Sequence, residues 1–134
     1  MTNFCTGEMS IDTEHDIVMA RKSVREAAVA LGFGVTDVTR IVTATSELTR
    51  NIYVYAGSGI MRWRFINSNA KGIELEFEDQ GPGIADVALA LQPGYTTGKG
   101  LGMGLPGSKR LMDEMEVHSE IGKGTTICIR KWIR

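Results

Sequence analysis

The chain has 134 residues and a formal net charge of −1, and 43% of its residues are hydrophobic and 23% charged, so we expect one cytoplasmic globular domain over residues 1–134. The near-neutral charge argues against a nucleic acid or a membrane surface as the partner. No apolar run reaches the roughly 20 residues of a transmembrane helix, and the N-terminal segment lacks the basic and apolar parts of a secretion signal.

The first predicted elements are a short strand at residues 9–11 and a long helix. Apolar residues recur at helical spacing over residues 13–31. Asp12 or Thr13 is the expected N-cap, and Gly32 is expected to end the helix. The side chains predicted to face the core are Ile17, Val18, Val24, Ala27, Ala28 and Leu31.

A second helix is predicted from Thr36, its expected N-cap, to about Ala56, where Gly57 stops it. Its predicted buried face consists of Val38, Ile41, Val42, Ala44, Thr45, Leu48 and Ile52.

The second half of the chain changes to a period of two, which is typical of strands. The predicted elements are strands at 60–66 and 73–78 around a turn at 67–72, a short helix at 86–91, a helix opening at Leu105-Pro106, and strands at 115–119 and 125–132 around a turn at 120–124. This order favours an α+β fold, a two-layer α/β sandwich with helices on one face of a mixed, mostly antiparallel sheet.

Glycine is concentrated between residues 78 and 107, which read EDQGPGIADVALALQPGYTTGKGLGMGLPG. Because glycine costs backbone entropy on folding, such a cluster indicates a linker, a tight turn or close approach to a ligand. A linker would be Gly/Ser-rich and featureless, whereas these glycines alternate with Leu101, Met103 and Leu105 and a helix follows.

Neither common phosphate-binding loop fits this segment. The stretch from Gly94 to Lys99 resembles a Walker A loop, but Gly100 stands where Ser or Thr should hold magnesium. The GxGxxG at Gly102 to Gly107 lacks the strand that leads into it in a Rossmann unit. A glycine loop before a helix N-terminus still favours phosphate, because free N–H groups and the helix dipole point there.

Two polar motifs stand outside the glycine cluster. Glu47 and Asn51 are four apart and share a helix face; they are either a solvated pair or a site that reaches a hard cation and orients a nucleophile. Asp79 follows a strand and precedes Gly81 and Gly83; it either closes a β-turn or accepts a hydrogen bond from a purine amino group.

The order of these motifs resembles the nucleotide-binding boxes of the GHKL ATPase superfamily. The motifs are SELTRN on a helix, EDQGPGI after a strand, GLGMGLPG before a helix and GKGT before the last strand. The chain has only His15 and His118 and no room for the dimerising hairpin of a histidine kinase. Within the superfamily the chain is most similar, over all its residues, to the RsbT-like switch kinases of the stressosome.

This resemblance implies a role for each matching residue. Glu47 would position or deprotonate the substrate hydroxyl, Asn51 would bind Mg²⁺, and Asp79, supported by Thr125, would bind the adenine amino group. The glycines would form the base slot (Gly81, Gly83) and, with Met103 between them, a lid over the phosphates (Gly98, Gly100, Gly102, Gly104). Lys99, in this lid, is our own candidate for a γ-phosphate contact, against a solvated loop lysine.

The resemblance also implies cofactors and partners. We expect ATP and Mg²⁺, transfer of phosphate to STAS-domain scaffold proteins (RsbS/RsbR-like), and activation of a PP2C-type phosphatase (RsbU-like) by the released kinase. The alternative is a non-catalytic anti-sigma-type switch that binds ATP and sequesters a partner. Cys5 and Cys128 form no metal or redox motif, so we expect two reduced thiols.

Overall fold

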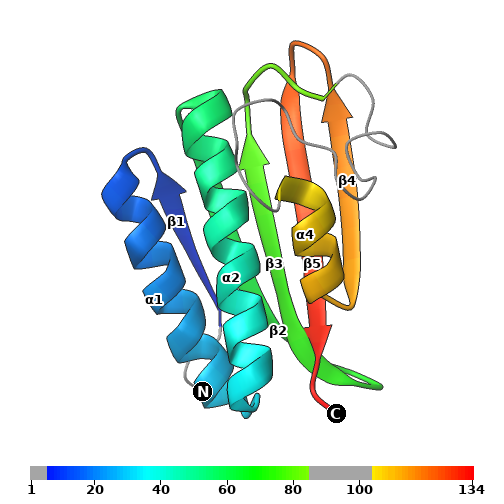
Figure 1. The fold of residues 1–134 in the computed structure, drawn as a ribbon. Coiled ribbons are helices and arrows are strands. Elements are labelled where there is room, and N and C mark those ends of the chain that lie inside the picture. The colour runs from blue at the N-terminus through cyan, green and yellow to red at the C-terminus, as the bar shows by residue number, and fades with distance from the viewer. Residues whose placement is uncertain (1–5, 85–103) are drawn as a thin grey trace.

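The computed structural model describes residues 6–84 and 104–134, and its elements form two layers, with the helices packed on one face of a five-stranded sheet (Figure 1). In chain order the elements are β1 (Gly7–Ile11), α1 (Glu14–Leu31), α2 (Val35–Asn51), the π-helix η1 (Ile52–Ala56), β2 (Gly59–Asn67), β3 (Lys71–Asp79), α4 (Gly104–Leu111), β4 (Glu114–Glu120) and β5 (Gly124–Trp132). The predicted α+β sandwich is confirmed, and the predicted helix at 86–91 lies outside the described residues.

The strand order is β1-β2-β3-β5-β4. All four pairings between the described strands are antiparallel, so the parallel pair that a mixed sheet would need does not occur among them. The core lies between the sheet and the helices, where the inward side chains of β3, Ile73, Leu75 and Phe77, are at most 2% exposed. The glutamates between them face outward, as the alternation predicts.

Helix α1 begins and ends as its sequence predicts. Thr13 and Asp16 form a capping box, in which each side chain accepts a hydrogen bond from the other residue's backbone N–H. Gly32 ends the helix in the left-handed region with φ 100°, a conformation that glycine adopts without strain. The prediction for Val18 is wrong, because its side chain is 52% exposed and Ala20 takes the buried position instead.

Helix α2 confirms its predicted buried face and corrects its predicted start. The N-cap is Gly34 and not Thr36, because the extended backbone of Gly34 already presents its carbonyl to the N–H of Val38 at 2.9 Å. At the other end the α-helix stops at Asn51 and one π-turn follows, which Gly57 closes by donating to the carbonyl of Ile52. Single π-turns of this kind occur frequently at functional sites.

The described residues contain no helix both long and apolar enough to cross a membrane. Cys128 is a half-buried free thiol on the outward face of β5, and Cys5 lies outside the described residues. Burial, together with the nearby Glu74, raises the pKa of Cys128 to about 11, so the thiol stays protonated near neutral pH.

Candidate functional site

The C-terminal half of α2 carries the two polar side chains on which the site depends. The buried hydroxyls of Thr45 and Thr49 donate to backbone carbonyls four residues earlier, at 2.8 and 2.7 Å, so they are satisfied within the helix. By contrast, Glu47 Oε2 and Asn51 Oδ1 are buried oxygens without a hydrogen-bond partner among the described residues. The predicted pair is therefore half-buried, and one oxygen of each side chain is shielded from solvent.

Unpartnered buried oxygens cost free energy, so they indicate a group that binds there. A carboxylate oxygen and an amide oxygen are ligands that Mg²⁺ prefers, and it commonly completes its shell with waters and substrate phosphates. Within residues 6–84 and 104–134 there is no cluster of three His, Cys, Asp or Glu side chains that would hold a metal alone. Asn51 Oδ1 thus fits a magnesium ion that arrives with a phosphate ligand, and Glu47 Oε2 is an acceptor for a second group.

The π-helix brings the end of β3 to this face. A Cβ added to Gly81 would lie 2.7 Å from the Cβ of Ala56, so the loop after β3 packs directly on η1. A Cβ on Gly59 would likewise meet Ile52, the residue after Asn51, and the side chain of Asp79. The turn that begins at Asp79 is therefore held beside η1, which directly follows α2.

Asp79 has one oxygen engaged and one available. Its Oδ1 accepts a hydrogen bond from the N–H of Gly81 at 2.8 Å, which fixes the turn. The turn interpretation is therefore confirmed, and the adenine interpretation stays a prediction. Among the described residues no hydrogen bond reaches Oδ2.

Thr125 lies directly opposite Asp79 in the β3–β5 register. Its hydroxyl, however, bonds the hydroxyl of Ser119 at 2.8 Å. Ser119 also accepts from the N–H of Ile84 at 2.7 Å and lies 3.1 Å from the carbonyl of Gly124. Sequence analysis missed Ser119, which joins the loop after β3 to the β4–β5 hairpin.

The packing of the loop after β3 explains why residue 83 is a glycine. Its φ is +80°, and a Cβ there would lie 2.4 Å from the carbonyl oxygen of Glu120. The neighbouring Pro82 carbonyl accepts from Gly122 N–H at 3.0 Å. Close packing of the loop on the β4–β5 turn thus explains Gly83 without a ligand, as close packing on Ala56 explains Gly81.

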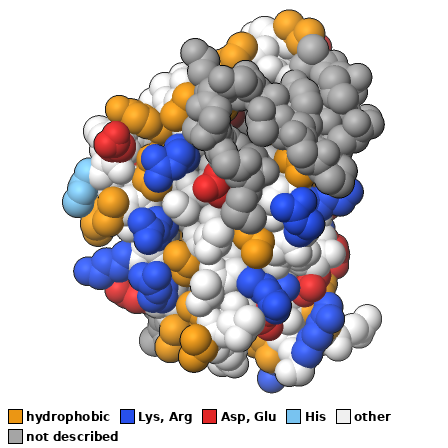
Figure 2. Space-filling model, in the orientation of Figure 1, with side chains coloured by type: hydrophobic (Ala, Val, Ile, Leu, Met, Phe, Trp, Pro, Cys, Tyr) orange, Lys and Arg blue, Asp and Glu red, His pale blue; other side chains and the backbone are white. Residues whose placement is uncertain are grey.

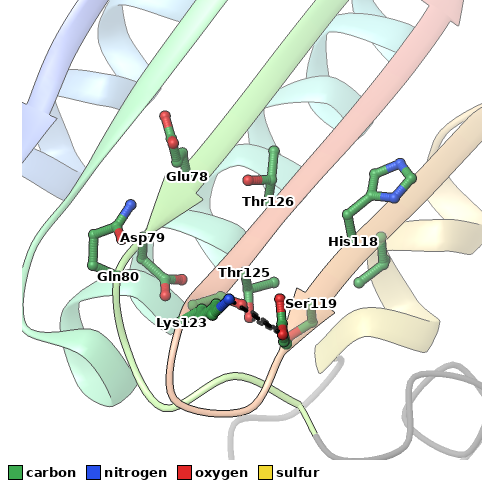
Figure 3. A pocket seen from close by; sticks show the side chains of 11 residues that line it. Glu78, Asp79, Gln80, His118, Ser119, Lys123, Thr125 and Thr126 are labelled. Atoms are coloured by element: carbon green, nitrogen blue, oxygen red, sulfur yellow. Dashed lines mark hydrogen bonds and ion pairs between the residues drawn. The ribbon is translucent and has the colours of Figure 1, made fainter.

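A hollow of about 540 Å³ opens where β3 and β4 end and β5 begins, and Figure 3 shows it from the side away from the helices. Glu78, Thr126 and His118 lie side by side across its strands, and their neighbours Phe77 and Ile127 point into the core. The hollow is therefore on the outward face, behind Asp79 and Thr125, and it is separate from the oxygens on α2.

The remaining predicted site residues divide between two regions. Gly98, Lys99, Gly100, Gly102 and Met103 lie outside the described residues. Gly104 begins α4, which packs beside α2 and starts near the end of the molecule where α2 finishes (Figure 1). The free N–H groups of a helix start are thereby placed at the same end as Glu47 and Asn51.

Comparison with known proteins shows the family of the chain. Residues 10–131 match the family described as histidine kinase-like ATPase domain. The chain is 51% identical over 125 residues to the serine/threonine-protein kinase RsbT of Bacillus subtilis (strain 168), covering 92% of this chain and 94% of that protein. It is 38% identical over 121 residues to the anti-sigma F factor of Caldanaerobacter subterraneus, covering 85% and 83%.

Solved structures share the fold. The RsbU and RsbW domains of a Mycobacterium tuberculosis protein align with a TM-score of 0.65 and 19% identity over 96% of this chain, which covers 33% of that one. The mycobacterial sensor histidine kinase MprB aligns with a TM-score of 0.56 and 21% identity, over 94% of this chain and 97% of that one. The chain thus belongs to the histidine kinase-like ATPase domain family and, within it, to the branch of the RsbT serine/threonine-protein kinases.

Proposed function

We propose that this kinase, as one domain in the cytoplasm, transfers the γ-phosphoryl group of ATP to a serine or threonine of a STAS-domain scaffold protein (RsbS/RsbR-like). When released from that scaffold, it binds and activates a PP2C-type phosphatase (RsbU-like). The observation that carries the proposal is the pair of buried, unpartnered oxygens on α2, Glu47 Oε2 and Asn51 Oδ1. Identity of 51% to RsbT supports the same kinase chemistry.

Glu47 is the proposed base and orienting group for the acceptor hydroxyl. Phosphoryl transfer requires little covalent help from the protein, because alignment and charge stabilisation lower most of the barrier. The hydroxyls of Thr45 and Thr49 are satisfied within α2, so they do not compete with Glu47 for the acceptor hydroxyl. Its carboxylate accepts the hydroxyl proton as the hydroxyl oxygen bonds to phosphorus and the bond to ADP breaks.

Asn51 is the proposed protein ligand of magnesium, one turn beyond Glu47. When bound, Mg²⁺ neutralises charge on the phosphate oxygens. Asn51 offers it an oxygen that no described residue already occupies. The side chain therefore fixes where the phosphates lie relative to the carboxylate of Glu47.

Asp79 is the proposed adenine-recognition residue. Its Oδ2 accepts from the adenine amino group, while Gly81 keeps the wall of the base slot thin and Thr125 supports the adjacent strand. Gly83 shapes the same loop. The lid formed by Gly98, Lys99, Gly100, Gly102, Met103 and Gly104 is proposed to close over the phosphates, with Lys99 on the γ-phosphate.

A second candidate function is an ATP-binding switch that sequesters a partner without phosphorylating it. Identities of 36 to 38% to anti-sigma F factors favour this candidate. The unpartnered carboxylate of Glu47 favours the enzyme, because a purely structural nucleotide site has no need of a base at that position.

The test is transfer of label from [γ-³²P]ATP with Mg²⁺ to STAS-domain proteins encoded in the same genome. We expect label on one serine or threonine, lost with Glu47→Ala and with Asp79→Asn. The matched control is Glu26→Ala, which removes an exposed carboxylate of α1 and should leave transfer unchanged. Binding of ATP without labelling of any STAS protein would favour the sequestering switch, and transfer by Glu47→Ala at the wild-type rate would refute its role.

A further inference from the structure

The cations of the two layers differ in their partners. On the outward face of the sheet, Arg62, Arg64 and Arg130 each donate to at least one glutamate. In the helices, six cations have no ion pair among the described residues: Arg21, Lys22, Arg25, Arg50, Lys109 and Arg110. Although the net charge is −1, these six cations therefore lie in the helical layer, which also carries the site.

Three of these cations belong to the elements that carry the site. Arg50 stands three residues after Glu47, so the two occupy neighbouring positions on one face of α2. Lys109 and Arg110 are exposed on α4, which packs against α2. Figure 2 shows Lys and Arg side chains distributed over this face of the molecule, across both the long helices and α4.

We propose that Arg50, Lys109 and Arg110 form a basic docking rim for the acceptor protein, whose phosphorylated hydroxyl is surrounded by acidic side chains. The inference rests on the proposed function, because it names the chemistry of the partner that delivers a hydroxyl to Glu47. The argument for this occupant is charge complementarity. Three cations without ion pairs among the described residues lie in the last turns of α2 and of α4, which packs against it, and α2 also carries the carboxylate that requires a hydroxyl beside it.

A helix-dipole contact or a nucleotide contact by the same cations would have different measurable effects. Arg50 lies in the last turn of α2, where a positive charge also interacts favourably with the helix dipole, and this effect would appear as stability. Cations near a phosphate site would also attract nucleotide, and this effect would appear in the dissociation constant of ATP. A docking rim acts instead on association with the acceptor protein and makes that association dependent on salt.

The experiment uses the STAS-domain protein that is labelled in the transfer assay above. The charge-removing variant is Arg50→Gln/Lys109→Gln/Arg110→Gln, and its matched control is the charge-keeping variant Arg50→Lys/Lys109→Arg/Arg110→Lys. A second control, Lys71→Gln, removes an exposed lysine that also lacks an ion pair among the described residues, at the β2–β3 hairpin at the opposite end of the molecule. Each protein is assayed for KM and kcat toward the acceptor, for the Kd of ATP and for thermal unfolding.

We expect the charge-removing variant to raise the KM for the acceptor about tenfold, at the low end of electrostatic steering, with kcat and the Kd of ATP within about twofold. Raising the salt from about 50 to about 300 mM should raise the wild-type KM and leave that of the variant nearly flat. The charge-keeping variant and Lys71→Gln should behave like wild type.

Three results would overturn the rim. The first is a charge-removing variant whose KM for the acceptor and salt dependence equal those of the wild type. The second is a charge-removing variant in which only the affinity for ATP falls. The third is an equal rise of the KM for the acceptor in both triple variants. Direct binding of the acceptor in the presence of ADP gives a readout that needs no transfer. If no STAS protein is labelled or bound by the wild type, the proposed function fails; if the wild type labels one and the variants label it equally well, only the rim fails.

Discussion

The outward face of the sheet and the face of α2 treat polar groups in opposite ways. On the sheet, Arg130 donates to three glutamates at 2.7 to 3.1 Å, and Arg62 likewise donates to three at 2.8 to 2.9 Å. On α2, Glu47 and Asn51 each have a buried oxygen without a partner among the described residues. The arginines of the sheet face are therefore satisfied within the fold, whereas the face of α2 leaves two oxygens for a ligand.

This difference separates stability from function. The ion pairs of Arg62, Arg64 and Arg130 with the glutamates of the sheet, here called the ion-pair ladder, stabilise the fold and leave few polar groups for a ligand. Unsatisfied buried polar groups instead lower stability, and proteins keep them where they bind a ligand or take part in catalysis. Substitutions on the sheet face should then lower stability and spare phosphoryl transfer. Substitutions of the unpartnered groups on α2 should do the reverse.

The largest expected effect comes from Glu47→Gln. Loss of the base should slow phosphoryl transfer by about 10² to 10⁴-fold. Because Gln makes neutral a group whose Oε2 is buried without a partner among the described residues, the free energy of unfolding should rise by about 1 kcal/mol. Single-turnover transfer and urea unfolding measure the two quantities on the same protein.

Glu26→Gln is the control for this prediction, because it makes the same chemical change on the exposed face of α1. It should alter neither rate nor stability. A Glu47→Gln protein that is clearly less stable than wild type would mean that the carboxylate has a structural partner, and the contrast between the faces would then be lost.

Arg130→Met is the converse substitution. The Arg130 side chain is 23% exposed and holds Glu74, whose side chain is 14% exposed, at 2.7 Å. Removing the cation while keeping most of the volume should lower the free energy of unfolding by about 2 kcal/mol and leave transfer within about twofold. If transfer instead falls as much as it does in Glu47→Gln, the sheet face takes part in function and the comparison is broken.

Most of the fold could be predicted from local patterns, because its signals lie within a few residues. The caps Thr13 and Gly32 end α1 as expected. The errors are local as well: Val18 lies at the margin of the apolar stripe, and Gly34 replaces Thr36 as a cap because its backbone carbonyl suffices.

The geometry of the candidate site could be predicted from residue spacing only where its residues are neighbours in the chain. Glu47 and Asn51 share a face because they are four apart. Ser119 bonds the N–H of Ile84 across 35 residues, and the contact of Ala56 with Gly81 depends on the π-turn, so neither has a local signal. The ion-pair ladder likewise requires the strand register, which alternation alone does not determine.

A smaller effect is expected from pH at Glu74. Burial alone would raise the pKa of this carboxyl, but hydrogen bonds from Arg64 and Arg130 outweigh it and hold the pKa below its ordinary value of 4.5. A carboxylate of this kind stabilises the fold above its unfolded pKa, and this contribution disappears as the pH falls through the folded pKa. Glu74→Gln should therefore cost about 1 kcal/mol at neutral pH and progressively less below pH 4.5.

Urea unfolding of both proteins between about pH 7 and pH 3 measures this difference. A constant gap across the range would show that the loss comes from packing and not from the charge of Glu74. Both proteins keep the ion pairs of Arg62 with Glu76 and Glu78, so the effect of acid on those pairs cancels in the difference.

Arg64→Met is the smallest expected effect and the most sensitive test of the ladder. Arg64 contacts Glu74 at 2.6 Å, but its own side chain is 60% exposed, so water replaces much of what the pair provides. Glu74 also keeps Arg130, and we therefore expect a loss of at most about 0.5 kcal/mol in the free energy of unfolding. A loss equal to that of Arg130→Met would mean that the two arginines are equivalent, and burial would then not determine how much each pair contributes to the stability of this face.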